Sequence, residues 1–338
     1  MMRLLYVSSG KRTLSDLNPN MIGAFRLLTR KVKGFRFESF LRLHESGEEL
    51  NRKLRLFKPD VILVFGHDNH PVLPQLRGSG APIGLWVVND PYSLDNYRRK
   101  VPSYDFIITQ DSGSIPFYQK MAKPCIHLPL AVNTTIYRPR SVPDSYASDV
   151  CFIGNGWPSR IRFFNRLSSY LQDKKFILIG AKWEKLNDYD RMKAGIINRT
   201  VSPQEAARYY NGAKVVLNIH RSPNDINKNP LRLPACTPNN RTFDIAACRA
   251  FQLLDQRRDL NRLYDPGREM VSFVNLKDLV EKMDYYLQHQ TEREKIAARA
   301  YRRTIQDHTY MKRLLVLLQR LPGVIRKTGR RDYLLKEG

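Results

Sequence analysis

Short apolar runs alternate with longer amphipathic stretches along all 338 residues of the chain. Runs of about four to eight apolar residues between turn-forming residues are typical of strands buried in a parallel sheet. In the first half of the chain, such runs predict strands at residues 4–7, 35–41, 60–66, 83–88, 105–109 and 127–131. In the second half, they predict strands at residues 149–154, 175–179, 214–219, 251–254 and 271–274.

The stretches between these strands carry apolar residues at helical spacing. They predict helices at residues 14–31, 48–57, 160–171, 202–212 and 276–287, and two further helices that open near residues 291 and 308. Two of these helices start at capping boxes, Ser202–Glu205 and Thr291–Glu294. Because strands and helices alternate in both halves, the sequence predicts an α/β protein with two parallel-sheet domains.

A linker with two prolines and no apolar periodicity, residues 138–146, divides the two halves. We expect an N-terminal Rossmann-like domain over residues 1–140 and a C-terminal one over residues 146–315. Residues 316–338 are predicted to form a basic C-terminal tail, which is expected to be flexible beyond Pro322. Such a tail would have weak affinity at most for anionic surfaces.

The charge of the chain points to acidic partners. It has 57 Lys and Arg against 32 Asp and Glu, a formal net charge of +25. This balance favours nucleotide phosphates, an anionic polymer, anionic lipid or nucleic acid as partners. The basic residues are spread along the whole chain, and the aromatic-basic signatures of common RNA-binding modules are missing from the sequence. We therefore expect no nucleic acid.

The cysteine pattern and the apolar runs favour a cytoplasmic protein. The four cysteines form no Cys-x-x-Cys pair, so free thiols in a reducing compartment are expected. The first apolar run is too short for a signal peptide, and no stretch approaches the roughly 20 apolar residues of a membrane span.

The stretch from Thr237 to Asp255 reads as a polar turn, a short helix and a buried strand. A helix N-terminus presents free N–H groups and a partial positive charge, which makes it a natural seat for phosphate. Arg241 in the first turn can add a fixed charge, and Asp244 can accept hydrogen bonds from ribose hydroxyls. The alternative is an ordinary helix start with an exposed arginine and aspartate.

Two other strand ends carry candidate side chains. Gly154 and Asn155 end a strand, and Arg160 follows in the first turn of a helix, so this turn is a second candidate phosphate-binding element. Asn218 and His220 end the strand at 214–219, where His220 is a candidate proton donor. The alternatives are a solvated arginine and a histidine packed under a loop.

Asp90 ends the strand at 83–88 of the first half. At a strand end its carboxylate could face an acceptor hydroxyl. A plain Asx-Pro turn with Pro91 is the equal alternative. The sequence Asp188-Tyr-Asp190 has the spelling of a metal-binding motif, but it lies in a polar, helical region and we expect it to be solvated.

Several of these segments resemble one known family. Residues 239–249 resemble the Asn-x-Arg-x-Phe-Glu-Ala-x-Ala-Cys-Gly segment of the CgeB/YkvP-like spore glycosyltransferases. Residues 86–92, 218–220 and 308–310 resemble the family's Trp-x-x-x-Asp-Pro-Tyr, Asn-x-His and His-Thr-Tyr segments. The chain departs from the family's pattern in one motif: Asp244 replaces a glutamate, Arg249 replaces a glycine, and Cys236 stands where related enzymes have a first glutamate.

The resemblance implies a GT-B fold, in which two Rossmann-like domains face a central cleft. It implies transfer of a sugar from a nucleoside-diphosphate sugar, expected to be a UDP-sugar, to a hydroxyl of a glycan, polyol or protein surface. The transfer would retain the anomeric configuration, need no metal or other cofactor, and serve the forming spore surface or the cell envelope. A catalytically inactive relative that binds a nucleotide or glycan is the alternative, because of Cys236.

The resemblance also implies roles for individual residues. The first domain would hold the acceptor and the second the donor. The expected catalytic residues are Asp90 and His220. The expected donor-binding residues are Gly154, Asn155, Arg160, Asn218, Asn240, Arg241, Thr242 and Asp244.

Overall fold

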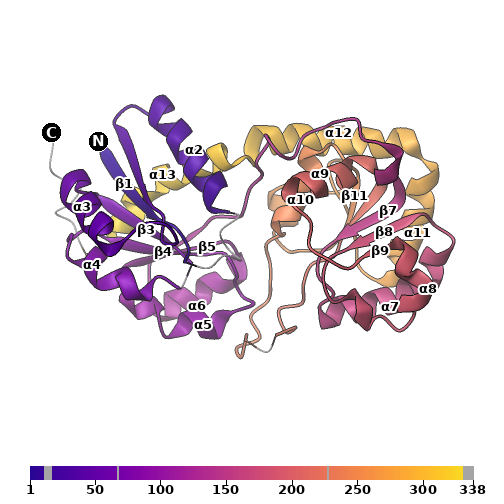
Figure 1. The fold of residues 1–338 in the computed structure, drawn as a ribbon, viewed down its shortest axis with the longest axis horizontal. Helices are drawn as coiled ribbons and strands as arrows, with labels where there is room; N and C mark the ends of the chain where they lie inside the picture. Colours follow the sequence, from indigo (N-terminus) through magenta and orange to yellow (C-terminus); the bar gives the residue numbers. More distant parts are fainter. Residues whose placement is uncertain (11–16, 67, 227, 330–338) are drawn as a thin grey trace. The chain divides into compact units, whose positions relative to one another are not determined.

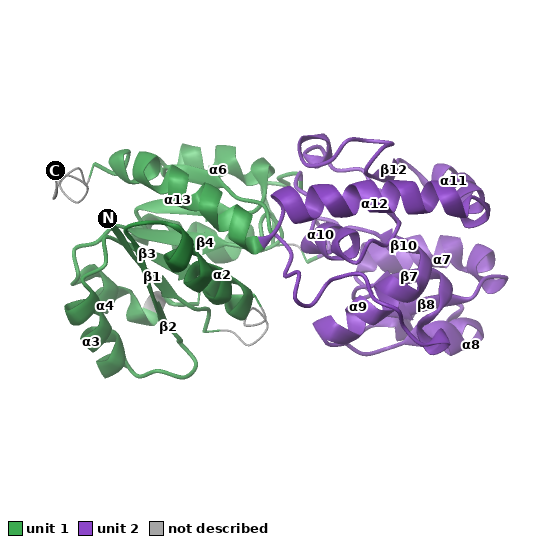
Figure 2. Cartoon of the chain, turned by 90° about the horizontal axis from the view of Figure 1, so that it is seen from above, with its two compact units in different colours: residues 1–130, 226–235, 310–338 green, residues 131–225, 236–309 purple. Residues whose placement is uncertain are grey.

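The protein divides into two compact units, shown in different colours in Figure 2. The computed structural model describes residues 1–10, 17–66, 68–226 and 228–329. Unit 1 comprises Met1–Leu130, Ile226–Ala235 and Tyr310–Gly338, and unit 2 comprises Ala131–Asp225 and Cys236–Thr309. Each unit is therefore built from segments that are separated in the sequence.

Unit 1 contains a six-stranded parallel sheet in the order β2-β1-β3-β4-β5-β6. Its strands are β1 (Met2–Val7), β2 (Phe35–Phe40), β3 (Val61–Phe65), β4 (Ile83–Val87), β5 (Phe106–Thr109) and β6 (Cys125–His127). Its helices are α2 (Asn18–Lys31), α3 (Gly47–Phe57), α4 (Leu73–Arg77), α5 (Leu94–Arg98), α6 (Ile115–Lys120) and α13 (Tyr310–Arg326). Every residue of β3 and β4 is buried, as expected for parallel strands with helices on both faces.

Unit 2 repeats this plan with the order β12-β11-β10-β7-β8-β9, again all parallel. Its strands are β7 (Ser148–Ile153), β8 (Phe176–Ile179), β9 (Ile196–Ile197), β10 (Ala213–Asn218), β11 (Gln252–Asp255) and β12 (Val271–Phe273). Its helices are α7 (Pro158–Gln172), α8 (Tyr189–Met192), α9 (Pro203–Gly212), α10 (Asn240–Ala247), α11 (Leu276–Gln288) and α12 (Gln290–Asp307). Figure 1 shows helices around each sheet.

The predicted α/β class with two parallel sheets is confirmed. One predicted strand is misplaced, because the last strand of unit 1 is Cys125–His127 and not residues 127–131. The sequence pattern also missed the two-residue strand β9 and the one-turn helix α8, which are too short to show periodicity.

Much of the C-terminal segment that was predicted as a tail is helical in the described residues. Helix α13 continues through Pro322 to Arg326 and buries an apolar face against α2 and β6. Its buried residues include Leu314, Leu317, Leu321 and Ile325. This spacing of three and four residues is that of an amphipathic helix, so the C-terminal segment is part of the core of unit 1.

The segment between β10 and α10 also belongs partly to unit 1. Within Ile226–Ala235, the side chain of Asn229 is buried, donates to the carbonyl of Leu233 (2.9 Å) and accepts from its N–H (3.0 Å). Leu233 packs against the core of unit 1, and the N–H of Asp95 donates to the carbonyl of Lys228 (3.1 Å). The chain thus leaves unit 2 and contributes to unit 1 immediately before it forms α10.

A substitution in α13 tests whether this helix supports unit 1. Leu321→Ala removes a fully buried side chain and should lower the free energy of unfolding by about 2–5 kcal/mol. Gln319→Ala, at an exposed position of the same helix, should change it by less than about 0.5 kcal/mol. Chemical denaturation measures both values. Equal, negligible effects would mean that the helix does not contribute to the core.

Candidate active site

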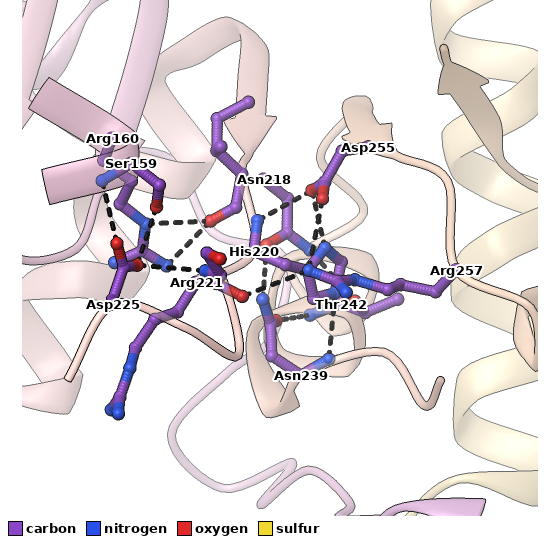
Figure 3. A network of polar contacts seen from close by, with 12 residues as sticks. Ser159, Arg160, Asn218, His220, Arg221, Asp225, Asn239, Thr242, Asp255 and Arg257 are labelled. Carbon is purple, nitrogen blue, oxygen red and sulfur yellow. Dashed lines mark hydrogen bonds and ion pairs between the residues drawn. The ribbon is translucent and has the colours of Figure 1, made fainter. Parts of the chain in front are cut away.

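A network of polar side chains lies at the carboxyl ends of β7, β10 and β11 in unit 2 (Figure 3). In parallel α/β sheets this edge is where ligands bind, because the strand ends and the following helix N-termini leave backbone groups open there. Helix α10 starts at this edge, directly after the segment that returns from unit 1.

The start of α10 is fixed by three polar side chains, two of them buried and one, Asn239, half-buried. Asn239 is the N-cap residue, and its Oδ1 accepts a hydrogen bond from the N–H of Thr242 (3.2 Å). Its Nδ2 donates to Oδ1 of Asn218 (2.9 Å), and Nδ2 of Asn218 donates to Oγ1 of Thr242 (2.9 Å). Asn218 and Thr242 are fully buried. They hold the helix start through partners within the protein, and their contact with a donor molecule stays a prediction.

His220 connects the end of β10 to the same helix start. Its Nδ1 lies 2.6 Å from Oδ1 of Asp255, and its Nε2 accepts a hydrogen bond from the N–H of Asn239 (3.1 Å). A backbone N–H can only donate, so Nε2 is unprotonated and the ring is neutral with its proton on Nδ1. Burial lowers the pKa of His220 to about 4, in spite of the neighbouring Asp255. Both ring nitrogens are occupied, so His220 is a positioning residue and not the predicted proton donor.

Asp255 ends β11 and anchors this histidine. Its Oδ1 also accepts the backbone N–H of His220 (2.7 Å), and Arg257 lies 3.4 Å from its Oδ2. Burial acts to raise the pKa of Asp255, but the interactions with His220 and Arg257 prevail and lower it. The carboxylate therefore stays ionised and keeps the proton of His220 on Nδ1.

Arg160 has internal partners instead of the predicted diphosphate. Its side chain is buried, its Nε and Nη2 donate to the carbonyl of Ile219 (3.1 and 2.7 Å), and its Nη1 donates to the carbonyl of Asn155 (3.1 Å). A Cβ at Gly154 would lie 2.9 Å from that Nη1, so the glycine leaves room for the guanidinium. Arg160 thus ties the turn after β7 to the end of β10.

The N-terminus of α7, the second predicted phosphate seat, is already occupied by a carboxylate. Asp225 accepts the N–H of Ser159 (2.8 Å) and its hydroxyl (2.6 Å). Asn155 uses its Oδ1 to accept the N–H of Ala181 (3.1 Å). The side chains at this turn are therefore engaged within the protein, and a phosphate would have to displace Asp225.

The N-terminus of α10 differs because its first groups are open. The N–H groups of Asn240 and Arg241 have no hydrogen-bond partner among the described residues, as is usual for the first turn of a helix. The Arg241 guanidinium is likewise not hydrogen-bonded within that part of the chain, and its Nε is buried. Two N–H groups and one unengaged guanidinium thus meet at one helix end.

Asp244 lies on the inner face of α10 and is buried. Its Oδ2 accepts a hydrogen bond from Nδ2 of Asn240 (2.9 Å). Burial raises the pKa of Asp244, while the charge of Arg241 and this hydrogen bond act in the opposite direction. The predicted contact with a ribose is not what the geometry offers, because this carboxyl group holds the side chain of Asn240 in place.

Asp90 lies at the carboxyl end of β4 in unit 1 and is fully buried. Its Oδ2 accepts hydrogen bonds from the hydroxyls of Thr109 (2.6 Å) and Tyr118 (2.7 Å). Burial raises its pKa to about 7, although both hydrogen bonds act to lower it. Its Oδ1 is also buried but has no hydrogen-bond partner among the described residues, and the role of Asp90 toward an acceptor hydroxyl stays a prediction.

Comparison with known proteins identifies the family. A model of the family described as "Glycosyl transferase-like" matches residues 149–319. The spore protein CgeB of Bacillus subtilis (strain 168) is 30% identical over 265 residues, which cover 76% of this chain and 81% of CgeB. This chain belongs to the CgeB-like glycosyltransferase family.

Solved structures confirm the GT-B fold of this CgeB-like glycosyltransferase. Sucrose-phosphate synthase of Thermosynechococcus elongatus has a TM-score of 0.62 at 9% identity and covers 96% of this chain and 100% of its own. HepE of Anabaena, solved in complex with UDP and glucose, has a TM-score of 0.62 at 12% identity with the same coverage. The matching residues 149–319 contain the whole polar network of unit 2.

Sequence reasoning about this CgeB-like glycosyltransferase missed Asn239, Asp225 and Asp255. Asn239 could have been found, because an asparagine three residues before a threonine at a helix start is a typical N-cap. Asp255 ends an apolar strand, which is a weaker signal. The partner of Asp225 is 66 residues away, and nothing in the sequence indicates that contact.

Among the residues that the structure describes, no group of three or more His, Cys, Asp and Glu side chains is arranged to hold a metal ion. Asp188 accepts a hydrogen bond from Ser168 (2.7 Å) and Asp190 is exposed. No helix in the same part of the chain is both long enough and apolar enough to cross a bilayer.

The position of the His220 proton predicts how stability depends on pH. The folded protein keeps His220 neutral down to about pH 4, whereas the unfolded chain binds a proton near pH 6.5. The stability that the protein gains from holding His220 neutral is therefore fully present above pH 6.5. It is lost as the pH falls towards 4, which lowers the free energy of unfolding by up to about 3 kcal/mol.

His220→Gln removes this titration. The difference in free energy of unfolding between wild type and variant should therefore narrow by up to about 3 kcal/mol between pH 7 and pH 4. NMR of the ring nitrogens should show a proton on Nδ1 at pH 7. A His220 pKa near 6.5, or a difference that is constant with pH, would contradict the assignment.

Proposed function

We propose that this enzyme transfers a sugar from a UDP-sugar to a hydroxyl acceptor and holds the donor diphosphate at the N-terminus of α10. The observation that carries the proposal is the set of unengaged donors there: the N–H groups of Asn240 and Arg241 and the Arg241 guanidinium. HepE, which shares the fold, has been solved with UDP and with UDP-glucose, which supports this choice of nucleotide.

The chemistry follows from where charge develops. When the glycosidic bond breaks, the diphosphate leaves with additional negative charge. A helix N-terminus and a guanidinium in its first turn can stabilise that charge with little reorganisation. Because these groups belong to the protein, we propose that the transfer needs no metal.

Proton transfer follows a different route from the one predicted. His220 donates to Asp255 and accepts from Asn239, and Asp90 is enclosed by Thr109 and Tyr118. Both ring nitrogens of His220 and Oδ2 of Asp90 thus already have partners within the protein. We propose that the acceptor oxygen bonds to the anomeric carbon on the face from which the diphosphate departs, while an oxygen of the departing diphosphate accepts the proton of the acceptor hydroxyl. Such a transfer retains the anomeric configuration.

The acceptor is proposed from the relatives. CgeB is a spore protein, and a glycan, polyol or protein surface of a forming spore or cell envelope offers the hydroxyl groups that such a transfer requires. The net charge of +25 suits an anionic acceptor of this kind.

Arg241→Ala tests the donor site. The loss of one charge-assisted contact, about 1.5–3 kcal/mol, should weaken UDP binding by about 10- to 150-fold in calorimetry. Consumption of UDP-sugars from a panel of donors should fall in parallel. Far-UV circular dichroism should be unchanged, because alanine is compatible with the first turn of α10.

Arg166→Ala is the matched control, since Arg166 is exposed on α7 of the same unit. It should bind UDP like the wild type. Equal UDP affinity of the Arg241→Ala variant and the wild type would contradict the proposed position of the diphosphate.

A further inference from the structure

A pocket of about 570 Å³ lies at the opposite edge of unit 2. It is lined by Ala213, the first residue of β10, and by Phe251, which directly precedes β11. These are the amino ends of the strands whose carboxyl ends carry the candidate active site. None of the residues assigned to that site lines the pocket. Its volume falls in the range of about 300–1,000 Å³ typical of small-molecule sites.

The charge on the pocket wall is mainly positive. Four basic side chains and one acidic side chain line it: Arg140, Lys214, Arg249 and Arg293, and Glu294. The first residue of α12, Gln290, also lines the pocket, so the positive end of an 18-residue helix faces the same space. An anion would therefore be attracted from several sides.

Two of these basic groups are occupied by partners within the protein. Lys214 forms an ion pair with Asp149 at 2.8 Å. Arg293 is buried and donates from Nη1 to the carbonyls of Tyr286 and Leu287 at the end of α11. They add positive charge to the wall while they hold its elements together.

The other two keep unused donors. The Nε of Arg140 is buried and has no hydrogen-bond partner among the described residues, although its Nη2 donates to the carbonyl of Ile136. Arg249 is exposed, and no hydrogen bond to its guanidinium exists within the described part of the chain. A buried N–H without a partner costs free energy unless a ligand accepts its hydrogen bond.

Arg249 also occupies an unusual backbone conformation. Its φ is 56°, in the left-handed region that glycine adopts without strain. Glycine is the common residue directly after a helix such as α10 for this reason. Arg249 adopts this conformation although it is strained for a residue with a side chain, and its positive side chain lines the pocket.

We propose that this pocket is a second binding site, which takes a small phosphorylated metabolite with its phosphate between Arg140 and Arg249. The remaining wall suits a hydroxyl-rich body, because Ser141 and Gln290 add polar side chains to it, although Nε2 of Gln290 also donates to Glu294 (2.8 Å). The site is separate from the donor site, since it lies at the other ends of the same strands.

Inorganic phosphate is the probe, measured by calorimetry at constant ionic strength with the donor site saturated by UDP. The wild type should still bind phosphate. Arg249→Gly should weaken this binding about tenfold or more, as expected for the loss of one charge-assisted contact. Since glycine favours the backbone conformation at 249, the variant should fold and melt no lower than the wild type.

Arg232→Gly is the matched control. Arg232 is an exposed arginine of unit 1 with a φ of 49°, so the variant loses the same charge at the same kind of backbone position. It should bind phosphate like the wild type. If the wild type does not bind UDP, the phosphate titrations are repeated without UDP on proteins that also carry Arg241→Ala. The test of this pocket therefore does not depend on whether the donor site has been placed correctly.

Three results would overturn the proposal. The first is equal phosphate affinity of Arg249→Gly and the wild type, and the second is no phosphate binding by the UDP-saturated wild type. The third is Arg249-dependent binding to vesicles that contain phosphatidic acid without any binding of inorganic phosphate, because a membrane would then be the ligand.

Discussion

The hydrogen bond from the N–H of Asn239 to Nε2 of His220 fixes the position at which helix α10 begins. It can form only while the ring is neutral with its proton on Nδ1, and Asp255 maintains that tautomer by accepting the proton's hydrogen bond. The chain reaches this point after a detour through unit 1, so local sequence alone does not define the start of the helix. The open N–H groups of Asn240 and Arg241 are aimed by this contact.

The polar groups below the helix start are satisfied by one another. Asn218, Asn239 and Thr242 form a closed set of hydrogen bonds, and Arg160 joins the ends of β7 and β10 through carbonyl groups. A fully satisfied buried network is rigid, because each member would lose a partner if it moved. Rigidity of this kind lets a helix end stabilise charge without reorganising, which is the basis of the catalysis proposed here.

Periodicity predicted the two sheets, since a strand such as Val61–Phe65 is apolar throughout and a helix such as Pro203–Gly212 starts at a capping serine. The start of the C-terminal helix was predicted but its length was not, because Pro322 and nearby basic residues suggested a tail, although leucines at 314, 317 and 321 have helical spacing. In the site, Asn240 and Arg241 remain open as predicted from a helix N-terminus. The contacts of Arg160 and His220 were not predictable from the sequence. Arg160 binds the carbonyl of Ile219, 59 residues away, and His220 binds Asp255, 35 residues away.

Binding of the donor diphosphate by the first turn of α10 can be tested directly by amide NMR during a titration with UDP. We expect the N–H resonances of Asn240 and Arg241 to shift most, because their unengaged protons would meet phosphate oxygens. Large shifts at the turn that precedes α7, around Ser159, with none at Asn240 and Arg241, would contradict it.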